Sequence, residues 1–375
     1  MDFPLFKAGC VAAAILGVVA FAQQGETKRV KLGSGKEIFE SGCIGCHGPN
    51  GKGQPQTVLG FDKPGTFPDF TRCDQTTPED NIAWRAVIRD GGPRRGFVQI
   101  MPSFSGLLTP TQIDQVIDYL RGFCTETGWP RGELNLPRAL ATEKAFPEDE
   151  WVVTTGINAQ GAPGVSNEIA FEKRFGARDQ IEVSVPVDFQ RPARGLWYGG
   201  AGDTGIGLKH VLASSLRTGS IVSLFGEVVL PTGNRPNGLG SGTWAFQTFA
   251  ASGQLLPARM FAQFQFGAEL PKDTLKAPQN VFFRSAIGKQ FNQARGVGRL
   301  WAPMFEFLAD RDLVTGARTN WDVMPEFQVT LSRRQHVRAN IGVRIPATNT
   351  AGRYPQLMLY LLWDRADGGL MEGWR

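Results

Sequence analysis

The sequence predicts two domains of different fold class, a small all-α domain followed by an all-β antiparallel domain of about twelve strands. Two observations support this prediction. Apolar residues recur with the helical period between positions 33 and 125, and with the strand period of two residues from position 151 to 375. The connections between the predicted strands alternate between long and short, which is typical of outer-membrane β-barrels.

The bulk composition bounds the classes of function. The chain has 375 residues and a net charge of +5, from 40 Lys and Arg against 35 Asp and Glu. This length allows more than one domain. The basic residues are scattered, whereas a nucleic-acid-binding protein concentrates them in a stripe. We therefore expect no nucleic-acid partner.

Residues 1–22 have the pattern of a signal peptide. Lys7 precedes an apolar run over residues 8–22, which ends in the small-x-small sequence Ala20-Phe21-Ala22. The run has about 15 residues, which is short for a membrane span of roughly 20; an uncleaved anchor is the alternative. Export places the remaining cysteines in an oxidising compartment. They are Cys43, Cys46, Cys73 and Cys124.

Three helices are predicted in residues 33–125. The first covers residues 35–43. The second has Thr77 as N-cap, Pro78 at the first helical position and Gly91 as its stop. The third begins at a capping box, with Thr109 as N-cap and Gln112 three residues later. Its apolar face consists of Ile113, Val116, Ile117 and Leu120.

The stretch SGCIGCHGPNGKG, residues 41–53, carries the clearest chemical signal. Its C-x-x-C-H spacing lets two thiols form thioethers to the haem vinyl groups while the adjacent histidine ligates iron. Here these residues are Cys43, Cys46 and His47. Between residues 23 and 150 the only histidine is His47 and the only methionine is Met101, which precedes a proline. Either Met101 completes the iron coordination or the iron is five-coordinate.

Two other uses of these cysteines are open. A zinc site could take Cys43, Cys46, Cys73 and Cys124 as its four ligands, but it would leave His47 and Met101 without a role. A redox dithiol would need a βαβ setting, which the pattern lacks. We expect Cys73 and Cys124 to form a disulfide, and two buried thiols are the alternative.

Residues 33–125 resemble the class I bacterial cytochromes c. The likeness rests on Gly35 and Phe39, the Cys43–His47 motif, Met101-Pro102 and a last helix that carries Tyr119 and Leu120. It implies one covalent haem c, attached at Cys43 and Cys46 and ligated by His47 and Met101. It also implies that Gly35 permits a close crossing of the first and last helices, with Phe39 near Tyr119. By the same resemblance, Arg89, Arg94 or Arg95 would pair with the haem propionates.

Residues 126–150 are rich in proline and charge, and we predict a linker there. The domain over 151–375 follows. Its predicted strands are 151–157, 166–175, 179–190, 203–213, 219–230, 243–251, 257–268, 280–290, 297–308, 319–331, 335–345 and 355–364. The odd-numbered connections are long and the even ones mostly short, so the chain enters the barrel from the periplasmic side.

Side-chain alternation and tryptophan placement fit a barrel. One face of the strand predicted over 179–190 is apolar and the other carries Glu182 and Asp188; the apolar residues are Ile181, Val183, Val185, Val187 and Phe189. Arg338 and Arg344 belong to a similar polar face on a later strand. Seven of the nine tryptophans follow residue 150. The stretches SNEIAFEKRFGARDQIEVSVPV, GDTGIGLKHVL and GEVVLPTG resemble outer-membrane channel proteins grouped with phenol-degradation pathways. The chain departs from that pattern after Trp363, and a secreted β-sandwich is the alternative.

These observations predict an electron carrier rather than an enzyme. His210 and His336 stand alone at strand positions, and no catalytic constellation accompanies them. We expect a monohaem cytochrome c in the periplasm, tethered to an outer-membrane barrel, with periplasmic redox proteins and membrane lipid as partners. The alternatives are a channel for a small solute, aromatic compounds among the candidates, and a secreted haem oxidoreductase.

Overall fold

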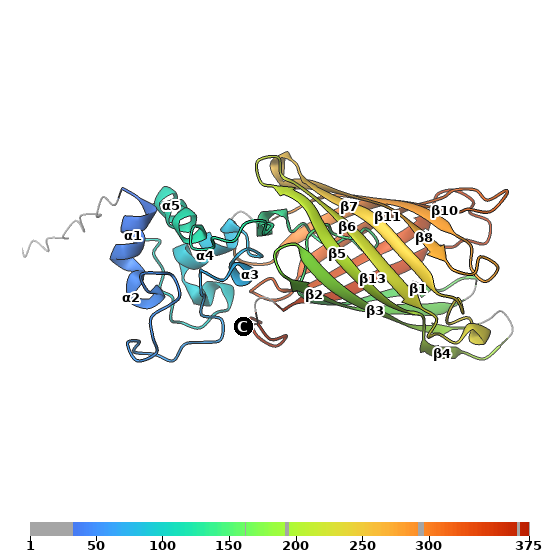
Figure 1. Cartoon of the computed structure of the whole chain (residues 1–375), viewed down its shortest axis with the longest axis horizontal. Helices are drawn as coiled ribbons and strands as arrows, with labels where there is room; N and C mark the ends of the chain where they lie inside the picture. The colour runs from blue at the N-terminus through green and yellow to red at the C-terminus, as the bar shows by residue number, and fades with distance from the viewer. Residues whose placement is uncertain (1–32, 162, 192–194, 292–295, 366–367, 375) are drawn as a thin grey trace, which may run out of the picture. The chain divides into compact units, whose positions relative to one another are not determined.

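The structure is a computed structural model that describes residues 33–161, 163–191, 195–291, 296–365 and 368–374. The predicted signal peptide, residues 1–22, lies outside these ranges. Helices occupy the first part of the described chain and strands the second, so the predicted fold class is confirmed (Figure 1). No helix in the described ranges is both long and apolar enough to cross a bilayer.

The helical domain contains six short elements. They are α1 (Gly35–Gly42), α2 (Ile44–His47), α3 (Cys73–Thr76), α4 (Asn81–Asp90), the 3-10 helix η1 (Gly92–Arg95) and α5 (Pro110–Arg121). The predicted capping box begins α5, because the Thr109 hydroxyl accepts from Gln112 N and the Gln112 side chain accepts from Thr109 N. All four residues of the predicted apolar face of α5 are buried.

The close crossing of α1 and α5 is confirmed. A Cβ built on Gly35 would lie 1.9 Å from the Gln115 carbonyl oxygen, so only glycine fits there. The Phe39 and Tyr119 rings pack with their centroids 5.4 Å apart. Gly35 therefore brings the two helices into contact, and the aromatic pair covers the crossing.

The predicted start of the second helix is wrong by three residues. Asp80 is the N-cap of α4, since its side chain accepts a 2.7 Å hydrogen bond from Ala83 N. Thr77 instead follows α3, and its hydroxyl donates to the Cys73 carbonyl. The helix ends at Gly91, as predicted, where φ is 85°.

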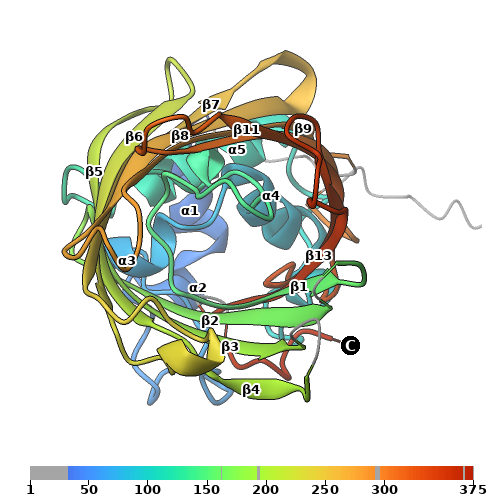
Figure 2. The same ribbon diagram turned by 90° about the vertical axis from the view of Figure 1, so that its right-hand side faces the viewer.

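The barrel strands follow from residue 150. They are β1 (Glu150–Asn158), β2 (Gly164–Phe175), β3 (Asp179–Gln190), β4 (Tyr198–Ala201), β5 (Thr204–Ser215), β6 (Ser220–Leu230), β7 (Ala245–Leu255), β8 (Met260–Pro271), β9 (Asn280–Lys289), β10 (Trp301–Asp312), β11 (Asn320–Thr330), β12 (Val337–Pro346) and β13 (Gln356–Asp364). Every pairing is antiparallel, and β1 pairs with β13, which closes the sheet into the ring that Figure 2 shows.

The ring has twelve strands because β4 and β5 act as one. β3 pairs with β5 over its first half and with β4 beyond Pro186. Between them Gly202 N donates to the Pro186 carbonyl at 2.9 Å. The connection from β9 to β10 runs from Lys289 to Trp301 and is longer than predicted. It reaches the helical domain, where a Cβ on Gly296 would lie 2.4 Å from the Ile82 carbonyl oxygen.

The barrel is apolar outside and polar inside. Exposed side chains on the strands include Ile206, Leu208, Phe264, Phe266, Phe307, Phe327, Ile341 and Val343. Buried side chains on the opposite face include Glu172, Gln263, Gln265, Glu306, Glu326, Gln328 and Asn340. A soluble sandwich would bury its apolar face, so the sandwich alternative is wrong. This side-chain pattern is that of a barrel surrounded by lipid.

The segment predicted to be a linker connects the two domains, but it is not an exposed linker. We call residues 134–148 the luminal segment. Its buried apolar side chains pack against inward-facing residues of the barrel; they are Leu134, Leu136, Ala139, Leu140, Ala145 and Phe146. Its backbone also bonds to strand side chains: Leu140 N donates to Glu326 at 2.9 Å and Thr142 N to Glu306 at 2.7 Å.

Charge pairing explains why composition misled the linker prediction. Arg138 forms ion pairs with Glu150 at 3.1 Å and Glu172 at 2.6 Å, and both carboxylates belong to strands. Lys144 pairs with Glu148 within the segment and with Glu150 at 3.5 Å. The charges of the predicted linker are thus matched to charges on the inner barrel wall.

Candidate haem site

The C-x-x-C-H motif forms a compact turn after α1. Cys43 caps α1, and Cys46 and His47 end α2. The following loop folds back on the motif, since Gly53 N donates to the His47 carbonyl and Gln54 N to the Cys46 carbonyl, both at 2.8 Å. These bonds fix the two cysteines and the histidine in one rigid unit.

The two motif thiols are free and half-buried. Burial, aided by the neighbouring Cys46, raises the pKa of the Cys43 thiol to about 11. A redox dithiol relies on a thiolate with a lowered pKa, so this environment disfavours that alternative. Two adjacent unbonded thiols are what thioether attachment of haem requires.

His47 lies between aromatic rings and is 8% exposed. Its imidazole is 5.3 Å from the Phe67 ring and 5.0 Å from the Phe70 ring, between centroids. Burial lowers the pKa of His47 to about 4, so the imidazole is neutral at pH 7. Its Nδ1 atom is buried without a hydrogen-bond partner among the described residues. A neutral imidazole is the form that ligates metals.

Met101 lies on a loop strapped to α4 and η1. Its carbonyl accepts from Gly92 N at 3.0 Å. On its other side the Ser103 hydroxyl donates to the Arg89 carbonyl at 2.6 Å, and Phe104 N to the Ile88 carbonyl at 3.0 Å. We call residues 96–103 the Met101 loop. It ends six residues before Thr109, the N-cap of α5.

One apolar core brings these groups together. Cys43 and Met101 both pack against it, and Phe70, a member of the core, contacts His47. The buried members are Ile38, Phe39, Phe70, Ile88, Ile113, Val116, Ile117 and Leu120. The Cys43 thiol, the His47 imidazole and the Met101 thioether thus border one core, with the free Cys46 thiol in the same turn. This donor set fits a covalently attached haem with His and Met ligands.

The two remaining cysteines form a disulfide. Cys73 and Cys124 are bonded, which links α3 to the chain after α5. Bonded sulfurs cannot ligate zinc as thiolates, so a zinc site with four cysteine ligands is wrong. Within the described residues, no group of three or more His, Cys, Asp or Glu side chains is placed to hold a metal ion.

The arginines expected near the haem propionates have other partners. Arg89 pairs with Asp90 at 2.6 Å. Arg95 is buried and donates to barrel turns rather than into the helical domain. Of these three arginines, only Arg94 is exposed. Sequence reasoning missed the role of Arg95 because its acceptors lie about 200 or more residues further along the chain.

The histidines of the barrel domain lie apart from this site. His210 forms a 2.7 Å contact with Asp179 on the neighbouring strand. His336 lies in the turn between β11 and β12 and is buried. Each stays a lone histidine, separate from the C-x-x-C-H motif.

Comparison with known families assigns the helical domain. Residues 33–123 match the family model for cytochrome c. These residues are a cytochrome c domain. The family carries covalent haem c and transfers electrons, and the match covers the motif and Met101. No curated protein matches the chain.

Several solved barrels are similar to the strand region, at low identity. The KdgM porin is 6% identical with a TM-score of 0.36, over 57% of this chain and 98% of that chain. The NanC porin is 6% identical with a TM-score of 0.39, over 57% and 98%. An outer-membrane channel from Pseudomonas putida F1 is 13% identical with a TM-score of 0.39, over 61% and 99%. At these values the case for the barrel rests on its own strand pairing and side-chain pattern.

Proposed function

We propose that this protein is a monohaem c-type cytochrome that transfers single electrons in the periplasm and is held at the bacterial outer membrane by its own barrel. The observation that carries the proposal is that Cys43 and Met101 pack against one apolar core whose Phe70 contacts His47. Cys46 is a second free thiol in the turn that holds Cys43. The cysteines would attach the haem, and the histidine and methionine would ligate its iron.

The ligand set favours electron transfer over catalysis. When bound, the haem supplies an iron centre that exchanges one electron. If His47 and Met101 both ligate the iron, a bound haem would have no position open to a substrate. The buried aromatic and aliphatic side chains of the core exclude water, and thioether ligation raises the reduction potential.

The barrel supports membrane attachment. Its outward side chains are apolar along the strands and its inward side chains are polar. This arrangement is stable when the outer surface is surrounded by lipid. The helical domain contacts the turns that contain Gly296 and Gln335, which join β9 to β10 and β11 to β12. The connection from β11 to β12 is short, and in bacterial barrels the short turns face the periplasm, which supports a periplasmic cytochrome domain.

A single haem at one end of the barrel suits relay within one compartment. The apolar layer of a membrane is about 30 Å thick, which is too far for one haem to bridge. We therefore infer that donor and acceptor are both periplasmic redox proteins.

The structure offers less support for a solute channel. The luminal segment packs against the inner wall through Leu136, Leu140 and Phe146 and bonds to Glu306 and Glu326. A solute would have to displace this segment. The barrel is better suited to anchoring than to transport.

A haem-stained gel of separated membrane and soluble fractions tests the proposal. We expect covalent haem in the outer-membrane fraction, in a band whose mobility changes on boiling. The oxidised protein should also show the sulfur-to-iron charge-transfer band of methionine ligation. Haem in the soluble fraction with no heat shift would contradict the membrane assignment, and an unstained band would contradict the cytochrome assignment.

A further inference from the structure

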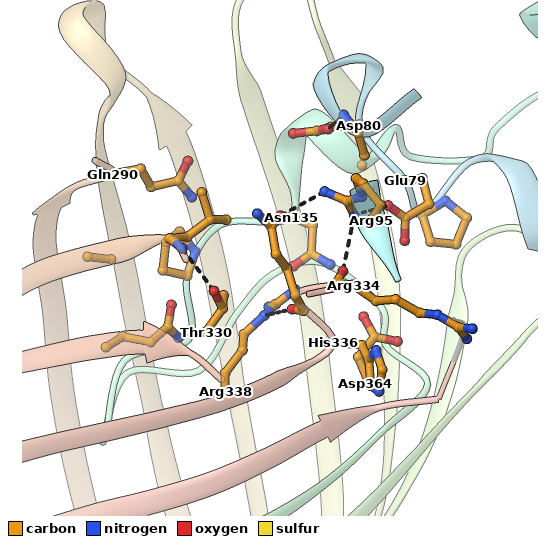
Figure 3. Close-up of a pocket in the computed structure, with 18 residues that line it drawn as sticks. Glu79, Asp80, Arg95, Asn135, Gln290, Thr330, Arg334, His336, Arg338 and Asp364 are labelled. Carbon is orange, nitrogen blue, oxygen red and sulfur yellow. Dashed lines mark hydrogen bonds and ion pairs between the residues drawn. The ribbon is translucent and has the colours of Figure 1, made fainter. Parts of the chain in front are cut away.

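The Met101 loop and the 3-10 helix before it contact the barrel, as α4 does at Gly296. Arg95, the last residue of η1, has its side chain in the barrel turns and is 3% exposed. Its Nη1 donates to the Gly296 carbonyl at 2.8 Å and to Gln335 Oε1 at 3.0 Å. Its Nη2 donates to the Arg334 carbonyl at 3.1 Å (Figure 3).

Barrel residues also contact Gly96 and Phe97, the two residues after Arg95. Arg334 Nε donates to the Gly96 carbonyl at 3.2 Å, and its guanidinium lies 4.6 Å from the centre of the Phe97 ring. Two features favour glycine at position 96: a Cβ there would lie 3.0 Å from Gly373 Cα, and φ is +76°. Arg95, Gly96 and Phe97 are therefore all held by barrel residues.

These three residues lead directly to the methionine. Phe97 N donates to the Gly92 carbonyl at 3.1 Å, and Gly92 N donates to the Met101 carbonyl at 3.0 Å. The two bonds close a small loop between η1 and Met101. Two backbone hydrogen bonds thus connect Phe97, through Gly92, to Met101.

We propose that Arg95 is a positioning residue through which the barrel turns hold Met101 against the iron. The inference rests on the proposed function. The other side of the site has no bond to this contact, because Gly53 and Gln54 donate to His47 and Cys46, and Cys43 donates to the Phe39 carbonyl of α1. Loss of the barrel contact should therefore free the methionine side of the site and leave the haem attached.

Arginine suits this position because its fork offers several donors in fixed directions. Three acceptors on two turns surround it, and two of them are backbone carbonyls. Glu79 lies 3.9 Å from Nη2 and balances the charge. The guanidinium also lines a cavity of about 80 Å³ between Asn135 and Thr330, which is large enough for bound water.

The test is displacement of Met101 by imidazole in the full-length ferric protein in detergent. Imidazole replaces the thioether at the iron, with one dative bond formed, one broken and no change in oxidation state. In Arg95→Gln we expect about tenfold tighter apparent binding, since the fraction of protein with an open position rises. The reduction potential should fall as methionine ligation is lost.

Three further variants make the test specific. Gln335→Gly removes an Arg95 acceptor from the barrel side, at a residue whose φ of 67° suits glycine, and should tighten binding in the same direction. Arg95→Lys keeps the charge and loses the fork, so it should fall between wild type and Arg95→Gln. The control is Arg333→Gln, which removes an exposed charge from the same turn and should leave binding unchanged.

Hydrogen exchange gives a readout that does not need the haem. The amides of Gly92 and Phe97 should exchange faster in Arg95→Gln and in Gln335→Gly, with exchange in α5 unchanged. Haem-stained protein with equal imidazole affinity in Arg95→Gln and Arg333→Gln would overturn the inference alone. Wild-type protein without covalent haem would overturn the proposed function and this inference with it.

Discussion

Replacing Arg138 by methionine should unseat the luminal segment. The guanidinium lies within 3.1 Å of Glu150 and 2.6 Å of Glu172, and both carboxylates are fully buried on the barrel wall. Methionine has a similar length and no charge, so both carboxylates lose their nearest cation. Lys144, 3.5 Å from Glu150, and Lys209, 3.9 Å from Glu172, would remain as more distant partners.

The expected magnitude follows from the cost of a broken buried pair. Removing one partner of such a pair destabilises by about 3–5 kcal/mol. The remaining lysines place Arg138→Met near the lower limit. A loss of about 3 kcal/mol changes the ratio of seated to unseated segment by roughly a hundredfold. Backbone bonds of the segment to Glu306 and Glu326 are unaffected, so the barrel itself should still fold.

Conductance in planar lipid bilayers measures this change directly. We expect the wild-type barrel to be nearly closed and Arg138→Met to open far more often. The double variant Arg138→Met with Glu172→Gln removes one unpaired carboxylate and should recover part of the closed state. Wild type and Arg138→Met could instead have equal conductance and equal temperatures for the gel-mobility shift. That result would refute the inference that Arg138 holds the luminal segment in place and thereby closes the barrel.

Three other predictions concern the cytochrome domain. Met101→Ala should abolish the sulfur-to-iron band and lower the reduction potential while the haem stain is kept; an unchanged spectrum would exclude Met101 as ligand. Replacing Cys73 and Cys124 by serine opens a loop with a sequence separation of 51 and should lower the free energy of unfolding by about 4 kcal/mol, measured by loss of helical circular dichroism in denaturant. Gly35→Val should destabilise the domain by about 3 kcal/mol or more because its Cβ meets a carbonyl of α5 at 1.9 Å, whereas Gly60→Ala, with no atom within 4 Å, should behave as wild type in the same assay.

Local patterns predicted the elements well. The strand expected over 179–190 is β3 (Asp179–Gln190), because strict alternation and a bounding turn fix both ends. The last helix of the cytochrome domain was predicted by its capping box and by the spacing of its apolar face. Such signals are local, so one sequence contains them in full.

Long-range pairing was beyond the sequence. The luminal segment reads as a linker because proline and charge are typical of solvated chain, and its match is the inner wall of strands that follow it. The role of Arg95 could not be predicted for the same reason, because its hydrogen-bond acceptors are residues of distant turns. The prediction of Thr77 as N-cap was wrong for a local reason, because Asp80, three residues later, is an equally good N-cap.

The position of the luminal segment has a consequence for assembly. The segment ends immediately before β1, and β1 pairs with β13 to close the ring. The seam therefore joins the first strand to the last, and the luminal segment leads directly into it. The disulfide-bonded cytochrome domain, the luminal segment and the seam strand β1 thus follow one another along the chain. We therefore expect folding of the cytochrome domain and closure of the barrel to be coupled.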